Sequence, residues 1–329
     1  MPIFGWLLIT TLFATIGCER SAQVQQAPDA PQTLTLQLNW FPEAEHGGFY
    51  TALINKEFKN RGLDVTIAPG GRAASLMGEL ATGRAAFAVT NAEDVVLFRD
   101  KGADVVAVMA VAQHHPRCIM VRADSGVDSL QSLKGLTLQV QPGRPYLEFL
   151  RKQGLLEGVT EVPYAGSVAQ TVTNPKFGQQ AYIYSEPLVA RQQGADVKTF
   201  MVSDLGFDPY SSILVTTSKM IRDQPELVRK MVTASIAGWQ SYLQLPESTN
   251  AYILTQNEQG MTSAALTEGV EILRPMCWVE SGSLAHLGSM TEARWQTLVQ
   301  QMTDIGLAKD VRPEECFDLS FLPQVTDRL

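Results

Sequence analysis

Short apolar runs rich in β-branched residues alternate with segments of helical spacing in the first third of the chain. Alternation of this kind indicates βαβ units around a mainly parallel sheet. The predicted strands are 34–39, 63–68, 86–90 and 105–111, and the predicted helices between them are 49–60, 74–81 and 92–101.

A second series of the same kind follows, and beyond Pro225 the spacing is helical only. Its predicted strands are 136–140, 160–163, 181–184, 198–202 and 212–217, and its predicted helices are 145–153, 167–172 and 187–193. We therefore predict an α/β fold of two lobes. Residues 34–118 and 214–329 form the first lobe with its C-terminal helices, and 119–213 form the second. A cleft between the lobes, at the carboxyl ends of strands, is the expected place for a ligand.

Composition supports a folded protein with a substantial core. The chain has 329 residues, of which 45% are hydrophobic and 18% charged. Its formal net charge is −8, and no block of Lys or Arg interrupts the acidic balance. A nucleic-acid partner is therefore not expected.

The N-terminus predicts export. Residues 3–17 are almost all apolar or small, and this run is shorter than the roughly 20 residues that span a bilayer. We predict a signal peptide over 1–18, in which residues 15–18 (Thr-Ile-Gly-Cys) resemble a lipobox that is acylated at Cys18. The alternatives are a plain cleaved signal or an uncleaved anchor. Polar residues 19–33 read as a flexible tether, so the prediction is an exported lipoprotein, on the periplasmic side or the outer face of the cell membrane.

The remaining cysteines, Cys118, Cys277 and Cys316, have no close pairing that would indicate a zinc or redox site. They are compatible either with one disulfide and one free thiol or with three buried thiols. The four histidines of the chain are not spaced as metal ligands. The sequence therefore predicts neither a metal nor another cofactor.

Six short motifs, in order, resemble one known family. The first is residues 39–50, Asn-Trp-Phe-Pro-Glu-Ala-Glu-His-Gly-Gly-Phe-Tyr. The others are 59–65 (KNRGLDV), 83–89 (GRAAFAV), 129–135 (SLQSLKG), 184–187 (YSEP) and 206–210 (GFDPY). Together they resemble the NMT1/THI5-like (SsuA/THI5-like) family of ABC transporter substrate-binding proteins.

This resemblance implies a two-lobed, type II periplasmic-binding-protein-like fold with the ligand cleft between its lobes. It implies a monomer that captures a small molecule and docks on an ABC permease in the inner membrane. The Trp-Phe-Pro and Gly-Phe-Asp-Pro-Tyr forms are more similar to the branches that bind thiamin-precursor pyrimidines. A sulfonate, taurine, nitrate or a riboflavin-like compound is the alternative ligand.

Two other functions are alternatives to this one. A eukaryotic branch of the family is a pyrimidine synthase with a cysteine-rich catalytic motif, and this chain has no clustered cysteines. The nucleophile elbow, the zinc-protease motif and the P-loop are also missing from the sequence, so an enzyme is not expected. A sensor that docks on a membrane kinase instead of a permease is not distinguished by the sequence.

The candidate ligand contacts begin with Trp40, whose indole can stack on a flat heteroaromatic ring. Its neighbour Phe41 cannot point the same way if the segment is extended. His46 can donate to the ligand or hold its own loop. Asn91 can contact the ligand or only cap the helix that follows it. Gln113 occupies a similar position after the next predicted strand.

In the second lobe, Glu186 can accept hydrogen bonds from the exocyclic amine of an aminopyrimidine, and the dipole of its helix also favours a carboxylate there. Arg144, with the backbone amides of residues 141–145, can hold an anionic group of the ligand or can be a surface arginine. Tyr184 and Tyr210 are candidate aromatic walls, with core packing as the alternative.

Overall fold

The computed structural model describes Met1 and residues 31–71, 75–257, 260–278 and 284–323. Contacts join Pro31–Leu329 into one compact unit, separate from Met1–Ala30. The predicted lipid attachment at Cys18, the signal peptide after Met1 and the tether up to residue 30 lie outside the described residues. Within the described part, no helix is long and apolar enough to span a membrane.

The first sheet has five strands in the order β2-β1-β3-β10-β4. β1 runs parallel to β2 and β3, whereas β10 is antiparallel to both of its neighbours, β3 and β4. The strands are β1 (Gln32–Gln37), β2 (Leu63–Ala68), β3 (Phe87–Thr90), β4 (Val106–Ala112) and β10 (Ser211–Thr216). This sheet is mainly parallel, as the alternating pattern predicted.

The second sheet repeats this plan in the order β7-β6-β8-β5-β9. β6 is parallel to β7 and β8, and β5 is antiparallel to β8 and β9. Its strands are β5 (Arg117–Arg122), β6 (Thr137–Val140), β7 (Thr160–Pro163), β8 (Phe177–Tyr182) and β9 (Val197–Met201). In each sheet the antiparallel strand is the one that the chain forms immediately after crossing from the other sheet.

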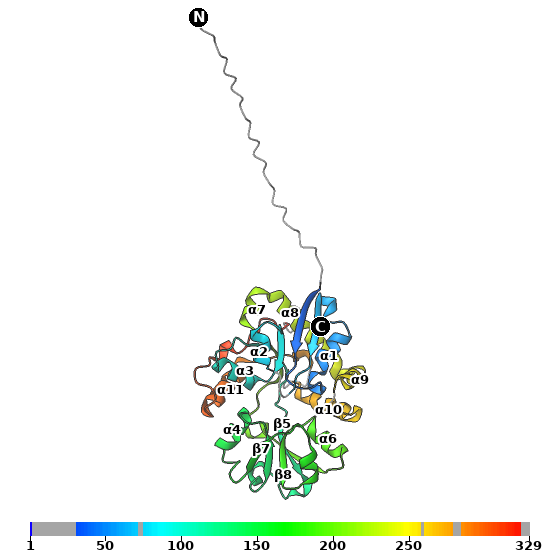
Figure 1. Cartoon of the computed structure of the whole chain (residues 1–329), viewed down its shortest axis with the longest axis vertical. Helices are drawn as coiled ribbons and strands as arrows, with labels where there is room; N and C mark the ends of the chain where they lie inside the picture. Colours follow the sequence, from blue (N-terminus) through cyan, green and yellow to red (C-terminus); the bar gives the residue numbers. More distant parts are fainter. Residues whose placement is uncertain (2–30, 72–74, 258–259, 279–283, 324–329) are drawn as a thin grey trace. The chain divides into compact units, whose positions relative to one another are not determined.

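Helices cover both sheets (Figure 1). Figure 1 shows α4 and α6 grouped around the second sheet, and α1, α2 and α3 beside the first. The helices of the first half are α1 (Gly47–Ile54), α2 (Leu76–Ala81), α3 (Ala92–Asp100), α4 (Pro145–Lys152), α5 (Ala169–Thr173) and α6 (Glu186–Gln192). Those that follow are α7 (Ser218–Asp223), α8 (Pro225–Gln244), α9 (Glu247–Gln256), α10 (Ser263–Met276) and α11 (Glu292–Asp304).

Helix α8 packs tightly against α1 through glycines of the 39–50 segment. A Cβ atom on Gly47 would collide with the ring of Tyr242, and one on Gly48 with the ring of Trp239. Both aromatic side chains are fully buried. The glycine pair is therefore needed for close packing, and this contact fixes the N-terminus of α1 beside the end of β1.

The structure confirms the predicted α/β class, and the bounds of several elements differ from the prediction, among them β8, which covers Phe177–Tyr182 instead of 181–184. β5 was not predicted, because the apolar run between its terminal arginines is only four residues long. β1 begins at Gln32, two residues earlier than expected. α1 ends at Ile54 instead of continuing to residue 60, because Lys56 adopts a left-handed backbone with φ of 63°.

Candidate ligand-binding site

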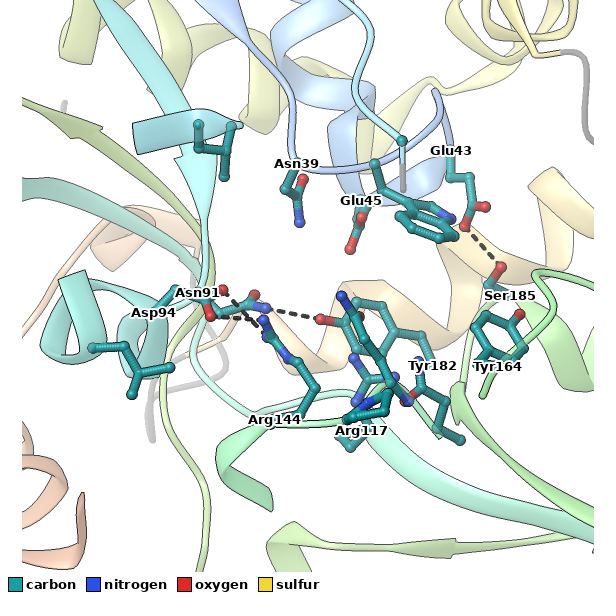
Figure 2. Close-up of a pocket in the computed structure, with 18 of the residues that line it drawn as sticks. Asn39, Glu43, Glu45, Asn91, Asp94, Arg117, Arg144, Tyr164, Tyr182 and Ser185 are labelled. Carbon is teal, nitrogen blue, oxygen red and sulfur yellow. Dashed lines mark hydrogen bonds and ion pairs between the residues drawn. The ribbon is translucent and has the colours of Figure 1, made fainter. Parts of the chain in front are cut away.

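A cavity of about 480 Å³ lies between the two sheets, at the edges where their parallel strands end (Figure 2). From the first sheet and its connections it is lined by Asn39, Trp40, Glu43, Glu45, Gly71, Ser75, Leu76, Met77, Asn91, Asp94, Leu97 and Phe98. From the second it is lined by Arg117, Gln141, Pro142, Gly143, Arg144, Tyr164, Gln180, Tyr182, Ser185 and Glu186. Its size suits a small organic molecule.

Trp40 is the aromatic residue of the first wall. Its ring meets that of Phe41 edge-on, with 5.3 Å between centroids and 72° between planes. Phe41 does not line the main cavity but a neighbouring one of about 280 Å³. Trp40 lines both cavities and Phe41 only the smaller one, so of the two adjacent aromatic side chains it is Trp40 that a ligand in the main cavity can contact.

His46 lies behind this wall and does not line the cavity. It is fully buried, and its Nδ1 accepts from the backbone N–H of Glu43 at 3.3 Å. Nε2 therefore carries the proton and donates to Oδ1 of Asn39 at 2.8 Å. Burial lowers the pKa of His46 to about 3, so the ring is neutral. With its oxygen engaged, the Asn39 amide has its N–H₂ group left as a donor for the cavity.

Three glutamates line the cavity, Glu43 and Glu45 from the first wall and Glu186 from the second. Glu43 accepts from the Ser185 hydroxyl at 2.7 Å, as Figure 2 shows. Burial raises the pKa of Glu43 well above its ordinary value, and the charges of Glu186 and Glu45 add to this. Glu186, the first residue of α6, accepts from the Tyr164 hydroxyl at 2.9 Å and from the Tyr182 backbone N–H at 2.8 Å.

Glu45 is nearly inaccessible to solvent at 1% exposure, and the Tyr184 hydroxyl donates to it at 3.0 Å. Burial raises the pKa of Glu45 to about 7, although the Tyr184 hydrogen bond and the charge of Arg117 act in the opposite direction. Tyr184 itself is buried and does not line the cavity. Tyr184 therefore orients the Glu45 side chain.

Arg144 lines the cavity, but its guanidinium is engaged with acids of α3. It forms a bidentate ion pair with Asp94 at 2.7 and 3.2 Å, drawn in Figure 2, and approaches Glu93 at 3.5 Å. Burial disfavours the charged form, but Asp94 and Glu93 outweigh it and raise the pKa of Arg144. This arginine already has its counter-charge from the protein.

Asn91 lines the cavity from the N-cap position of α3, without a capping hydrogen bond from its side chain. Its Oδ1 instead accepts from the Ser211 hydroxyl at 2.7 Å. Its Nδ2 donates to the Tyr182 hydroxyl at 2.9 Å, so it joins the two walls (Figure 2).

Gln113 and Tyr210 lie away from the cavity. Gln113 is buried and donates to the Ser289 carbonyl at 3.0 Å. Tyr210 accepts from the Thr291 N–H, and the guanidinium of Arg294 stacks 3.8 Å from its ring centroid. It lines a separate cavity of about 190 Å³. Both side chains are thus held by contacts with the segment that leads into α11.

Sequence reasoning did not single out several residues that line the cavity. Asn39, Glu43 and Glu45 belong to the 39–50 motif, which the resemblance did identify as a unit. Arg117 had no such signal. Because β5 is antiparallel to β8, its first residue pairs with Tyr182, the last residue of β8. Arg117 therefore reaches the edge at which the parallel strands end.

In the part of the chain that the structure describes, no group of His, Cys, Asp or Glu side chains could hold a metal ion. Cys118, Cys277 and Cys316 are buried free thiols, and burial raises the pKa of each. Of the two arrangements considered for them, the structure has the three buried thiols.

Comparison with known proteins gives consistent results. A family model described as NMT1/THI5 like matches residues 43–249. A formylaminopyrimidine-binding protein from Halalkalibacterium halodurans is 26% identical over 264 residues, which are 77% of this chain and 78% of that protein. The riboflavin-binding protein RibY from Chloroflexus aurantiacus is 27% identical over 241 residues, 67% of this chain and 66% of that protein.

Solved structures extend the likeness to the fold. The crystal structure of the periplasmic aliphatic sulphonate binding protein SsuA from Escherichia coli superposes with a TM-score of 0.65 at 14% identity. The match covers 87% of this chain and 92% of that one. At this identity the likeness concerns the fold alone, and it confirms the predicted two-lobed periplasmic-binding-protein fold.

Proposed function

Because this chain belongs to the NMT1/THI5-like family, as its motifs predicted, we propose that it is the solute-binding component of an ABC-type importer. Its ligand is a small polar heteroaromatic molecule of the thiamin-precursor pyrimidine class. The observation that carries this proposal is a cavity with one accessible indole and several buried carboxyl groups. A relative named as a formylaminopyrimidine-binding protein supports it.

The chemistry of an aminopyrimidine matches these groups. Its flat ring stacks on Trp40, which contributes about 0.5–1.5 kcal/mol beyond the apolar area that is buried. Its exocyclic amine donates to Glu45 or Glu186, and charge-assisted bonds of this type are among the stronger hydrogen bonds. A ring nitrogen accepts from the free N–H₂ of Asn39, which His46 orients.

The lobes are the moving parts in this proposal. The lobe that carries the first sheet and the lobe that carries the second close on the ligand, and the closed form docks on a permease. The protein acts as a monomer that is exported by residues 1–18, anchored through Cys18 and tethered by residues 19–33. Binding involves no covalent step, so the protein is not an enzyme.

A riboflavin-like ligand is the second candidate, and one observation favours it. The neighbouring cavity of about 280 Å³ shares part of its wall with the main one. The residues common to both are Trp40, Glu43, Tyr164, Ser185 and Glu186. A ligand larger than a pyrimidine can therefore extend past Trp40. Anionic ligands such as sulfonate, taurine or nitrate fit less well, because four carboxyl groups line the cavity and Arg144, one of its two arginines, is already paired.

A thermal-shift screen of the purified full chain tests the proposal. The compounds are aminopyrimidines with and without a formamide group, riboflavin, an alkanesulfonate, taurine and nitrate. A ligand that binds the native state raises the melting temperature by mass action. A rise with an aminopyrimidine supports the proposed ligand class, and a rise with riboflavin alone selects the second candidate. A rise with the anions alone overturns both.

A further inference from the structure

Arg117 is a buried cation to which the protein offers no counter-charge in direct contact. Its side chain lines the main cavity, and the residue is only 7% exposed. Among the described residues, its guanidinium has no hydrogen-bond or ion-pair partner, and Nε is buried without one. Burying an unpaired charge is unfavourable, so buried arginines are nearly always paired. An arginine left in this state at a cavity indicates that its partner is a bound molecule.

Aromatic rings hold Arg117 in place. Its guanidinium carbon lies 4.2 Å from the centroid of the Tyr182 ring and 5.2 Å from that of Tyr146. Such cation–π contacts orient a guanidinium but leave its N–H groups free to donate. Figure 2 shows Arg117 beside Tyr182 on the second wall.

Two carboxyl groups act on Arg117 without touching it, Glu45 from the first wall and Glu186 from the same wall as Arg117. Glu45 and Glu186 both interact with it electrostatically. Neither forms an ion pair with it, so both pairs of charged atoms are more than 4.0 Å apart. All three side chains line the cavity. A ligand bound beside Arg117 therefore has both a donor and acceptors within the same cavity.

We propose that Arg117 is a ligand-binding residue that donates to a carbonyl oxygen of the ligand, while Glu45 or Glu186 accepts from an adjacent N–H. The ligand class is then a heteroaromatic ring that carries a neutral amide-type group: a formamide, a carboxamide or a ring lactam. A neutral carbonyl fits better than an anion, because several carboxyl groups line the same cavity. This inference rests on the proposed function and narrows its ligand class.

The proposal is tested by calorimetric titration of the full chain with two matched ligands. One is an aminopyrimidine that carries a formamide, and the other is the same ring with a free amine in place of the formamide. The variants are Arg117→Met and Arg117→Lys, and the matched control is Arg122→Met, at the other end of β5 and away from the cavity.

Arg117→Met should weaken binding of the formamide ligand at least 30-fold and that of the free amine less than threefold. Arg117→Lys, which keeps the charge but loses the fork of N–H groups, should weaken only the formamide ligand, by about tenfold. Arg122→Met should change neither affinity by more than twofold. The ligand-free melting temperature of Arg117→Met should be no lower than that of Arg122→Met, since no ion pair is lost.

If Arg117→Met lowers the affinity for the two ligands equally, or lowers neither affinity, the proposal is overturned. If Arg117→Met does not fold, Arg117→Lys decides by the same criterion. Wild-type protein that binds the free amine but not the formamide overturns this inference and leaves the proposed function standing. Wild-type protein that binds neither of them, nor riboflavin, overturns both.

Discussion

The two walls of the cavity come from sheets of the same topology but carry different charges. The first wall contributes Glu43, Glu45 and Asp94, whose oxygens are acceptors when ionised. The second contributes Arg117 and Arg144, whose groups are donors, together with the carboxyl group of Glu186. Matched strand orders bring the two edges together, but the residues at the strand ends decide what each edge binds. A molecule held between them needs both an acceptor and a donor.

The two arginines of the second wall show how the same side chain takes different roles. Arg144 precedes α4 and is neutralised by Asp94 and Glu93 across the cavity, so it joins the walls. Arg117 begins the antiparallel strand β5 and rests on Tyr182, and no acid of the described residues lies within ion-pair distance of it. Arg144 therefore joins the two walls, and Arg117 is left to bind a ligand. Four substitutions test this contrast and the contrast between the walls.

The largest effect is expected for Arg144→Gln. It leaves Asp94 and Glu93 largely buried without their shared cation, which should lower the free energy of unfolding by about 3 kcal/mol. Urea unfolding measures this, and adding Asp94→Asn should recover part of the loss. A loss below about 1 kcal/mol would mean that this pair does not join the walls.

The next effect concerns the pH dependence of stability through Glu45. Its pKa is about 7 in the folded chain and has its ordinary value near 4.5 in the unfolded chain. The folded chain therefore binds a proton at Glu45 more tightly than the unfolded chain does. The protonated carboxyl contributes its full stability below pH 4.5, and this contribution is lost as the pH rises through 7. Between pH 4.5 and 8, the stability of Glu45→Gln should rise relative to wild type by about 3 kcal/mol.

Urea unfolding of both proteins at several pH values checks this prediction. The glutamine keeps the size of the side chain and stays neutral throughout. Curves of unfolding free energy against pH that remain parallel for the two proteins would contradict it.

Trp40→Ala should weaken ligand binding at least tenfold without unfolding the protein, because the stacking surface is lost. Phe41→Ala is the matched control, since Phe41 lines only the neighbouring cavity. This substitution should weaken ligand binding less than threefold. Calorimetry measures both. Unchanged affinity in Trp40→Ala would remove this residue from the binding site, and equal losses in the two variants would remove the distinction between the cavities.

The smallest effect is expected for Tyr182→Phe. This substitution removes the hydroxyl that accepts from Asn91 but keeps the ring under Arg117. The unfolding free energy should fall by about 1 kcal/mol, the usual net value of one hydrogen bond. An unchanged value would show that the Asn91 bond does not stabilise the contact between the walls.

The fold could be predicted well from the sequence where the local signals agree. β2 and β7 match their predicted bounds, because turn residues delimit short runs of strand-forming residues. β5 could not be predicted in this way. Its apolar residues are few, and its antiparallel direction depends on how the chain crosses from one sheet to the other.

The same physical reason limits what could be predicted of the site. Trp40, Asn91, Arg144 and Glu186 follow strands or begin helices, and all four line the cavity. Within the described part of the chain Arg144 is paired and Arg117 rests on an aromatic ring, and both states depend on contacts between residues far apart in the sequence. His46 and Tyr184 lie one layer behind the cavity, and only packing distinguishes such positions from those that line it.

A crystal structure of the full chain with the ligand that gives the largest thermal shift tests the central claim most directly. The account predicts one molecule in the main cavity, with its ring on Trp40, an oxygen on the guanidinium of Arg117 and an N–H on Glu45 or Glu186. A ligand seated only in the smaller cavity beside Tyr210, or one that leaves Trp40 and Arg117 untouched, would contradict it.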